Sequence, residues 1–221
     1  MIFKLTPKDY DYPALLKEIP DPPKILYAMG NRKLLTDSSQ ALAVVGTRKM
    51  TVYGKTAAYN IVFALAKLGV TIVSGLASGI DTVAHQAALA ANGKTIAVLA
   101  SGVDVVYPPE NKDLYREISK KGLLLSEFPP GTLPKPQYFP QRNRIVSGLC
   151  LGVLVVEGPL KSGSMITAKL ALDQGREVFA VPGPITSPNS RGPSYLIKNG
   201  ASVAESAEDI MDCFTPLKHR G

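Results

Sequence analysis

The sequence has little of the side-chain chemistry on which many enzymes and secreted proteins depend. Its 221 residues include two cysteines, Cys150 and Cys213, which are too few for a disulfide framework or a cysteine-based zinc site. There are also two histidines: His85 lies in a helical pattern and His219 in a polar tail, so both are more simply explained as incidental than as catalytic. The H-E-x-x-H, C-x-x-C, G-x-S-x-G and Walker lysine motifs are absent. These absences argue against the hydrolase, metalloprotein and redox classes that those motifs define.

Long apolar segments are missing as well. No apolar run is long enough to span a bilayer. Residues 1–7 lack the apolar core of a signal peptide. We therefore expect a cytoplasmic protein with no membrane partner.

Acidic residues are absent from two stretches, 38–80 and 128–156. The whole chain carries a formal net charge of +7, which favours a polyanionic partner such as nucleic acid. Buried strands and helices account for the apolar parts of both stretches, but not for the basic residues in their loops. The basic residues within the two stretches are Arg48, Lys49, Lys55 and Lys67 in the first and Lys135, Arg142 and Arg144 in the second.

Apolar strand-length runs alternate with helical patterns from Ala41 onward. Continuous apolar strands of this kind indicate a mostly parallel sheet with helices on both faces, and hence an α/β fold. We expect strands at 41–45, 70–73, 95–99, 123–125, 151–156, 177–181 and 201–203, and helices near 57–68, 80–88, 111–120, 142–149, 164–172 and 206–213.

Proline placement divides the chain into segments. Residues 1–40 carry several prolines between short apolar pieces, so we expect an irregular N-terminal cap. Residues 41–214 form the main domain in this interpretation, and residues 215–221 form a C-terminal tail. The proline-rich stretch 128–141 is predicted to be a loop, and its unusual length suggests a functional one.

The loop from Gly46 to Gly54 follows the first strand of the main domain and precedes a helix. A strand, a glycine turn and a helix open a Rossmann-type unit, in which amides at the helix start bind phosphate. The G-x-G-x-x-G fingerprint is absent, and Arg48 stands where its second glycine would be. The loop therefore suits a phosphate bound by amides and a guanidinium rather than a dinucleotide. The alternative is a surface arginine on an ordinary turn.

Two further loops are candidates for anion binding, because ligands of parallel sheets bind at the carboxyl ends of the strands. Residues 74–81 hold two glycines and two serines before a helix, and Asp81 could equally be a capping residue. Residues 161–164 read Lys-Ser-Gly-Ser, where Ser162 or Ser164 could simply cap a helix. Ser101 and Gly102 follow another strand, and we expect them at the same edge.

Residues 139–144 combine an aromatic ring, two arginines and an amide. This combination is typical of single-stranded nucleic-acid binding, in which a base stacks on the ring and cations meet the phosphates. The alternative is that Phe139 packs in the core and one arginine pairs with an acid. Arg144 in particular could face inward at helical spacing.

Together these motifs resemble the DprA/Smf family of bacterial DNA-processing proteins. The resemblance covers nearly the whole chain and lies in residues 12–13, 21–23, 30, 46–54, 74–81, 126–131, 139–145, 162–168, 174–178 and 181–183. It implies an extended Rossmann-like fold that binds single-stranded DNA, has no enzymatic activity and needs no cofactor or metal. It further implies a homodimer that protects incoming strands in natural transformation and recombination and helps to load the recombinase RecA.

On this chain, the resemblance places a phosphate pocket at Arg48 and the glycine and serine loops, with an adjacent groove at Phe139 and residues 142–144. Many family members also carry a helical N-terminal domain and a winged-helix C-terminal domain. We expect both to be reduced or missing here, which leaves duplex binding open. The full set of candidate DNA-binding residues is Gly46, Thr47, Arg48, Ser74, Gly75, Ser78, Gly79, Ser101, Gly102, Lys135, Phe139, Arg142, Asn143, Arg144, Lys161, Ser162, Gly163 and Ser164.

One enzymatic alternative stays open. The sheet pattern is similar to that of phosphoribohydrolases, whose P-G-G-x-G-T-x-x-E motif begins a helix at the comparable place. Residues 158–167 occupy that place here and lack the glutamate needed for acid–base chemistry. A nucleotide-processing hydrolase is therefore the second hypothesis.

Overall fold

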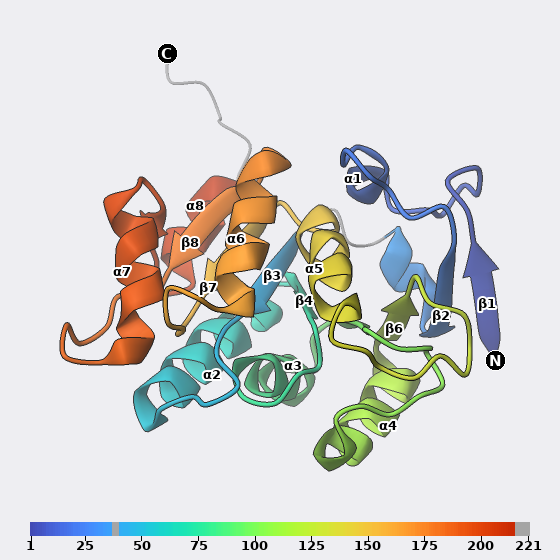
Figure 1. Cartoon of the computed structure of the whole chain (residues 1–221), viewed down its shortest axis with the longest axis horizontal. Helices are drawn as coiled ribbons and strands as arrows, with labels where there is room; N and C mark the ends of the chain where they lie inside the picture. The colour runs from blue at the N-terminus through green and yellow to red at the C-terminus, as the bar shows by residue number, and fades with distance from the viewer. Residues whose placement is uncertain (37–39, 215–221) are drawn as a thin grey trace.

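A single mixed sheet forms the centre of the molecule (Figure 1). The computed structural model describes residues 1–36 and 40–214, and the predicted tail at 215–221 lies outside the described residues. Across the described residues the strand order is β1-β2-β6-β5-β4-β3-β7-β8-β9. The strands are β1 (Ile2–Leu5), β2 (Leu26–Gly30), β3 (Ala41–Val45), β4 (Thr71–Ser74), β5 (Thr95–Val98), β6 (Leu123–Ser126), β7 (Gly152–Val155), β8 (Glu177–Ala180) and β9 (Ser202–Val203).

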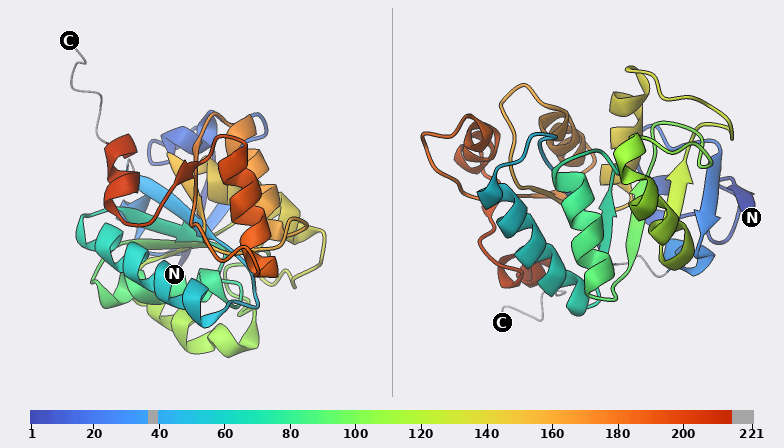
Figure 2. Two further views of the ribbon diagram at one scale, coloured as in Figure 1. Left: turned by 90° about the vertical axis from the view of Figure 1, so that its left-hand side faces the viewer. Right: turned by 90° about the horizontal axis from the view of Figure 1, so that it is seen from below.

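Helices cover both faces of this sheet (Figure 2). Alternate residues of the central strand show why: Ala41, Ala43 and Val45 pack on one side, and Leu42 and Val44 on the other. The first side is covered by α1 (Ala14–Lys17), α5 (Tyr138–Gly148), α6 (Gly163–Asp173) and α7 (Arg191–Lys198), and the second by α2 (Val52–Lys67), α3 (Ile80–Ala90), α4 (Lys112–Lys121) and α8 (Glu208–Phe214). Short 3₁₀ helices are η1 (Arg32–Leu35), η2 (Pro109–Asn111) and η3 (Pro188–Ser190).

The α/β fold with a mostly parallel sheet is confirmed. The strands from β6 through β5, β4, β3, β7 and β8 to β9 pair in parallel. The chain builds β3 to β6 outward in one direction, then returns to place β7 on the other side of β3. The junction of β3 and β7 is thus a topological switch point, and a crevice opens there at the carboxyl ends of the strands. None of the helices in the described part of the chain is long and apolar enough to cross a membrane.

The N-terminal segment differs from its expectation as an irregular cap. Its strands β1 and β2 extend the sheet, with β1 antiparallel to β2 and β2 antiparallel to β6. Leu26 and Ala28 are buried in β2 while the residues between and after them are not, which is a period of two. The prolines between and around these short strands obscured the alternation in the sequence.

The predicted loop 128–141 is shorter than expected. Helix α5 already begins at Tyr138, and Pro140 lies in its first turn. Proline is tolerated there because its missing N–H would have no partner inside the helix. Phe139 and Arg142 therefore lie on the same helix start.

Candidate nucleic-acid interface

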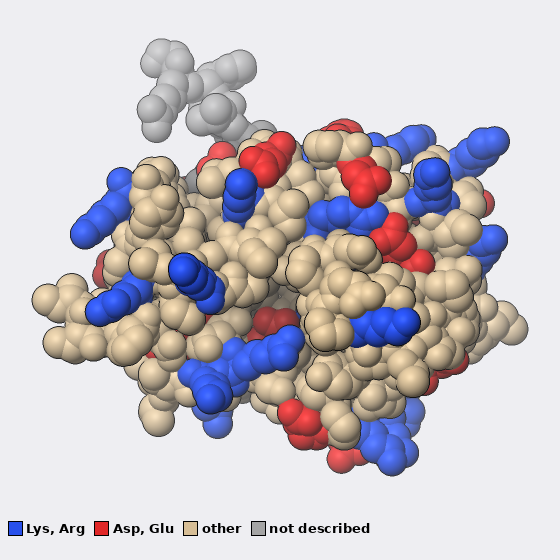
Figure 3. Space-filling model, in the orientation of Figure 1, with Lys and Arg blue, Asp and Glu red and all other residues tan. Residues whose placement is uncertain are grey.

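A pocket of about 340 Å³ lies at the switch point, where loops follow β3, β4 and β7 and meet the start of α5. Figure 3 shows the face that contains it: a central hollow with lysine and arginine side chains beside it. The structure brings together at this pocket ten of the residues predicted from the sequence. They are Gly46, Thr47, Arg48, Gly75, Phe139, Arg142, Asn143, Ser162, Gly163 and Ser164.

The loop that carries Arg48 is fixed by its backbone. The Thr47 amide donates to the Glu157 carbonyl at 2.7 Å, and the Thr47 carbonyl accepts from the Ile80 amide at 3.2 Å. Gly79 lies directly beneath the loop with a φ of +84°, and a Cβ there would come within 2.8 Å of the Arg48 Cα. A glycine is required at this position both by its backbone conformation and by the close approach of the loop.

Thr51 and Glu157 hold the helix that follows. Thr51 caps α2 by accepting from the Gly54 amide at 3.1 Å. Its own amide and hydroxyl donate to the two carboxylate oxygens of Glu157, at 2.9 Å and 2.6 Å. Glu157 is 2 % exposed. This buried carboxylate therefore fixes Thr51, and with it the start of α2, at the end of the Arg48 loop.

Arg48 and Phe139 face one another at the edge of the pocket. The Arg48 guanidinium carbon lies 5.0 Å from the centroid of the Phe139 ring, which is a cation–π geometry. The ring of Tyr107 meets Phe139 edge-on, with 5.8 Å between centroids. Arg48 is exposed, and among the described residues no carboxylate pairs with it. The site thus presents an unneutralised cation beside a partly buried aromatic ring.

Arg142 forms part of the pocket floor. It is 5 % exposed, and its Nη1 donates to the carbonyl of Val98 at 2.8 Å. Burial lowers the pKa of Arg142, and the negative charge of Asp81 opposes that shift. Gly75 packs so closely that its missing Cβ leaves the space for this guanidinium.

Asp81 is the acidic partner below the same floor. Its carboxylate accepts from the amides of Gly75 and Ala77 at 3.2 Å and 3.3 Å. Burial raises its pKa, while the charge of Arg142 and those two amides act in the opposite direction. Arg142 and Asp81 therefore place two opposite charges under the pocket, and the net positive charge comes from the rim.

The start of α6 forms the third wall. The Ser162 hydroxyl caps the helix by accepting from the Met165 amide at 3.4 Å, and it lies 2.9 Å from the Ser164 hydroxyl. Asn143 donates its side-chain amide to the Gly163 carbonyl at 3.3 Å, which joins α5 to α6. Ser162 is thus a cap and also part of the pocket, as both interpretations of the sequence allowed.

Several predicted residues lie outside this pocket. Ser74 is fully buried and donates to the Val44 carbonyl at 2.7 Å. Ser101 is buried and Gly102 donates to the Thr132 carbonyl; both follow β5, which is separated from β3 by β4 and so lies too far from the switch point. Ser78 donates to Glu110 at 2.7 Å, in a neighbouring hollow that Arg48 also lines.

Three predicted cations also lie outside the pocket lining. Lys161 is exposed on the loop before α6. The Lys135 ammonium lies 5.8 Å from the Tyr138 ring centroid. Arg144 donates to both carboxylate oxygens of Glu127, at 2.9 Å and 2.6 Å, which is the inward pairing that the sequence left open.

Tyr107 was missed by sequence reasoning. It precedes Pro108 and Pro109 in a segment with no strand or helix pattern, so nothing in the sequence relates it to Phe139. Within the described residues no group of histidine, cysteine, aspartate or glutamate side chains could hold a metal ion.

The fold and the pocket define a class: a Rossmann-like protein in which an arginine-bearing loop stands in place of the dinucleotide fingerprint. The chain belongs to the family described as DNA recombination-mediator protein A, whose family model matches residues 4–215. It is 50 % identical over 201 residues to the DNA processing protein DprA of Bacillus subtilis, covering 91 % of this chain and 67 % of that protein. It spans about half to two thirds of the length of the first curated relatives that it matches.

Two solved structures are close in fold. The X-ray structure of DNA processing protein A from Streptococcus pneumoniae has a TM-score of 0.92 and 43 % identity, over 96 % of this chain and 74 % of that one. A structure on the single-stranded DNA binding mode of DNA processing protein A from Helicobacter pylori has a TM-score of 0.87 and 32 % identity, over 97 % and 95 %. The fold predicted from the sequence is therefore that of the family.

Proposed function

We propose that this chain binds single-stranded DNA without sequence preference and acts in natural transformation and recombination. The observation that carries the proposal is the exposed, unneutralised Arg48 stacked against Phe139 at the mouth of the switch-point pocket. The H. pylori protein, described by its single-stranded DNA binding mode, supports it.

The geometry suits a strand rather than a mononucleotide. The Arg48 guanidinium and the hydroxyls at the start of α6 offer donors to phosphate oxygens. The Phe139 ring offers a surface on which any base can stack, since every base has a π face. Neither group reads the edge of a base, so binding is expected to be independent of sequence.

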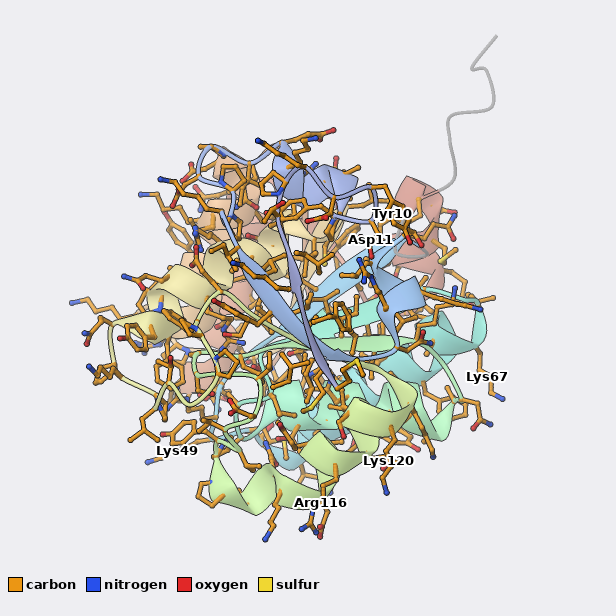
Figure 4. All side chains as sticks on the ribbon, turned by 90° about the vertical axis from the view of Figure 1, so that its right-hand side faces the viewer. Tyr10, Asp11, Lys49, Lys67, Arg116 and Lys120 are labelled. Carbon is orange, nitrogen blue, oxygen red and sulfur yellow. The ribbon has the colours of Figure 1, made fainter. Side chains whose placement is uncertain are left out.

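Arg48→Ala tests the site. Removing one phosphate contact should weaken oligo-dT binding about tenfold and lower the slope of log affinity against log salt by about 0.7. Fluorescence anisotropy at several salt concentrations measures both. Arg116→Ala is the charge-matched control, because Arg116 lies on α4, a helix that does not line the pocket (Figure 4). Equal affinities of the two variants would contradict the site assignment.

We also propose the finer partner assignments that the family resemblance implies: a cytoplasmic homodimer that protects incoming strands and helps to load RecA onto them. A surface available for self-association is the end of the molecule at α6 and β9, where Leu172 and Val203 are exposed. Light scattering across a concentration range should give twice the chain mass. A single-chain mass at all concentrations would refute the homodimer.

The phosphoribohydrolase alternative has no comparable observation in its favour. Both carboxylate oxygens of Glu157 accept from Thr51, and Asp81 is buried against two amides. Neither acid is left poised to move a proton on a ligand. Release of free base from a nucleoside monophosphate, lost in a Glu157→Gln or Asp81→Asn variant, would reverse this preference.

A further inference from the structure

A second pocket, of about 310 Å³, lies along α7, and we call it the α7 pocket. Arg191, Ser194 and Lys198 line it from positions i, i+3 and i+7 of that helix, which place them on one side. The rest of the lining comes from Leu160, Ile185, Ser187, Ser190 and Tyr195.

The lining is basic and contains no acid. Arg191 and Lys198 are exposed, and among the described residues neither has a carboxylate partner. Two cations on one side of the helix, about two turns apart and with no carboxylate partner, form a local site for an anion.

Ser190 adds a hydroxyl to this lining. The absence of a side chain at Gly183 leaves the space that this hydroxyl occupies. A hydroxyl on the wall of a basic pocket can donate a hydrogen bond to a phosphate oxygen.

Three hydrogen bonds join the loops of the α7 pocket to those of the switch-point pocket. The Gly158 amide donates to the Asn189 carbonyl at 2.7 Å, and the Gly192 amide donates to the Gly158 carbonyl at 2.9 Å. The Asn189 side-chain amide donates to the Lys49 carbonyl at 3.0 Å. The loop 158–162 thus stands between the two pockets: Pro159 and Ser162 line the first, and Leu160 lines the second.

We propose that the α7 pocket binds a phosphate group of the same DNA strand that occupies the switch-point pocket. The proposal rests on the proposed function and extends it. It predicts that the bound DNA strand runs from the switch-point pocket across loop 158–162 to the α7 pocket, and so covers more nucleotides than the first pocket alone would hold. Lys161, exposed on that loop, lies along the path. Leu160 and Ile185, which are 48 % and 95 % exposed, offer apolar contact to the sugar and base of the same nucleotide.

The test compares oligo-dT of increasing length on the R191S/K198S double variant by fluorescence anisotropy. For the shortest oligonucleotide that the wild type binds, affinity should be unchanged. Longer ones should bind about three- to tenfold more weakly, with a salt slope lower by about 0.7. Ser190→Ala should produce a smaller loss with the same length dependence.

Lys120→Ser serves as the control, because Lys120 is an exposed cation on α4, a helix that lines neither pocket (Figure 4). An unchanged affinity of the double variant at every length overturns the inference, and so does an equal loss at every length. If Arg48→Ala weakens binding while the double variant does not, the proposed function stands and only the α7 pocket fails. If the double variant weakens binding while Arg48→Ala does not, the assignment of the DNA site to the switch-point pocket fails, and with it the strand shared by the two pockets, which overturns the inference.

A free nucleotide is the other source of a phosphate. Calorimetric titration with thymidine monophosphate separates the two sources. Binding to the wild type that the double variant abolishes would make the α7 pocket a mononucleotide site and overturn the proposal. Absence of such binding, together with the length-dependent loss, supports a strand.

Discussion

Two glycines shape the pocket because they have no side chain. Gly75 leaves room for the Arg142 guanidinium, and Gly79 leaves room for the Arg48 loop. Both lie in the loop after β4, although the Arg48 cation comes from the loop after β3 and the Phe139 ring from the start of α5. Sequence reasoning assigned these glycines to an anion nest. In the structure they are spacers that let two chain segments approach.

Gly79→Ala should destabilise the protein by about 1–3 kcal/mol and weaken DNA binding, because the new methyl group would push against the backbone that carries Arg48. Urea denaturation and anisotropy measure the two effects. Gly175→Ala is the matched control: its φ is +67°, but nothing lies within 4 Å of a Cβ there. The control places an alanine at a positive φ without the crowding, and it should keep full DNA affinity. A similar loss of affinity in both variants would show that crowding beneath the loop is unimportant.

His85 has a structural role that predicts a pH dependence of stability. It is fully buried, and its Nδ1 lies 2.7 Å from the Thr95 hydroxyl. Burial, with the nearby charge of Arg142, lowers its pKa to about 3 from an ordinary value of 6.5. The unfolded chain therefore binds a proton below about pH 6.5 that the folded chain does not, so stability falls as pH drops from there toward 3.

At pH 5 this linkage should cost about 2 kcal/mol relative to neutral pH. A His85→Gln variant cannot titrate and should lack this part of the loss. The measurement is the free energy of unfolding of both proteins at the two pH values, so that any constant cost of the substitution cancels. Identical pH profiles would mean that the pKa of His85 is the same in the folded and unfolded states.

At the scale of elements, the helix after the Arg48 loop depends on one threonine. Thr51 both caps α2 and donates to the buried Glu157. Thr51→Ala should cost about 1–3 kcal/mol of stability, because a cap is lost and a buried carboxylate oxygen loses a donor. Thr51→Ser keeps the hydroxyl and should retain most of the stability in urea denaturation. If the serine variant is as unstable as the alanine variant, the methyl group rather than the hydroxyl carries the effect.

The elements were predictable where one physical signal was dominant. Continuous apolar runs identified the parallel strands, and helical spacing identified the helices between them, because both patterns follow from burial on two faces. The strands β1 and β2 were missed, since short strands among prolines carry little alternation and gain their pairing from β6, far along the chain. The start of α5 was missed because Pro140 was taken as a helix breaker, whereas the first helical turn accepts it.

At the scale of the whole molecule, the contents of the site depend on strand order. The loops after β3, β4 and β7 were expected at one edge, and they meet there. The Ser101 loop was expected with them, but the sheet order places β4 between β5 and β3. Distances across a sheet are set by long-range pairing, and a single sequence does not reveal that pairing.

Arg144 ties distant parts of the molecule together. Its guanidinium pairs with Glu127 and, through Nε at 3.1 Å, with Asp21 of the N-terminal segment. Arg144→Ala should destabilise the protein by about 1–3 kcal/mol while leaving the DNA affinity of the folded protein unchanged. Arg48→Ala should do the reverse, so urea denaturation and anisotropy on both variants separate the roles. A loss of DNA affinity in folded Arg144→Ala protein would show that Arg144 contacts DNA, as the sequence analysis predicted.

The hydrogen bonds that join Lys49, Gly158, Asn189 and Gly192 have a kinetic consequence. They hold the loops at the switch point together without a ligand. Binding therefore carries little entropic cost of ordering these loops. The encounter itself then limits association, and long-range attraction between a polyanion and this basic chain accelerates it. On such a surface, differences in affinity between DNA strands are expressed mainly in how long each one stays bound.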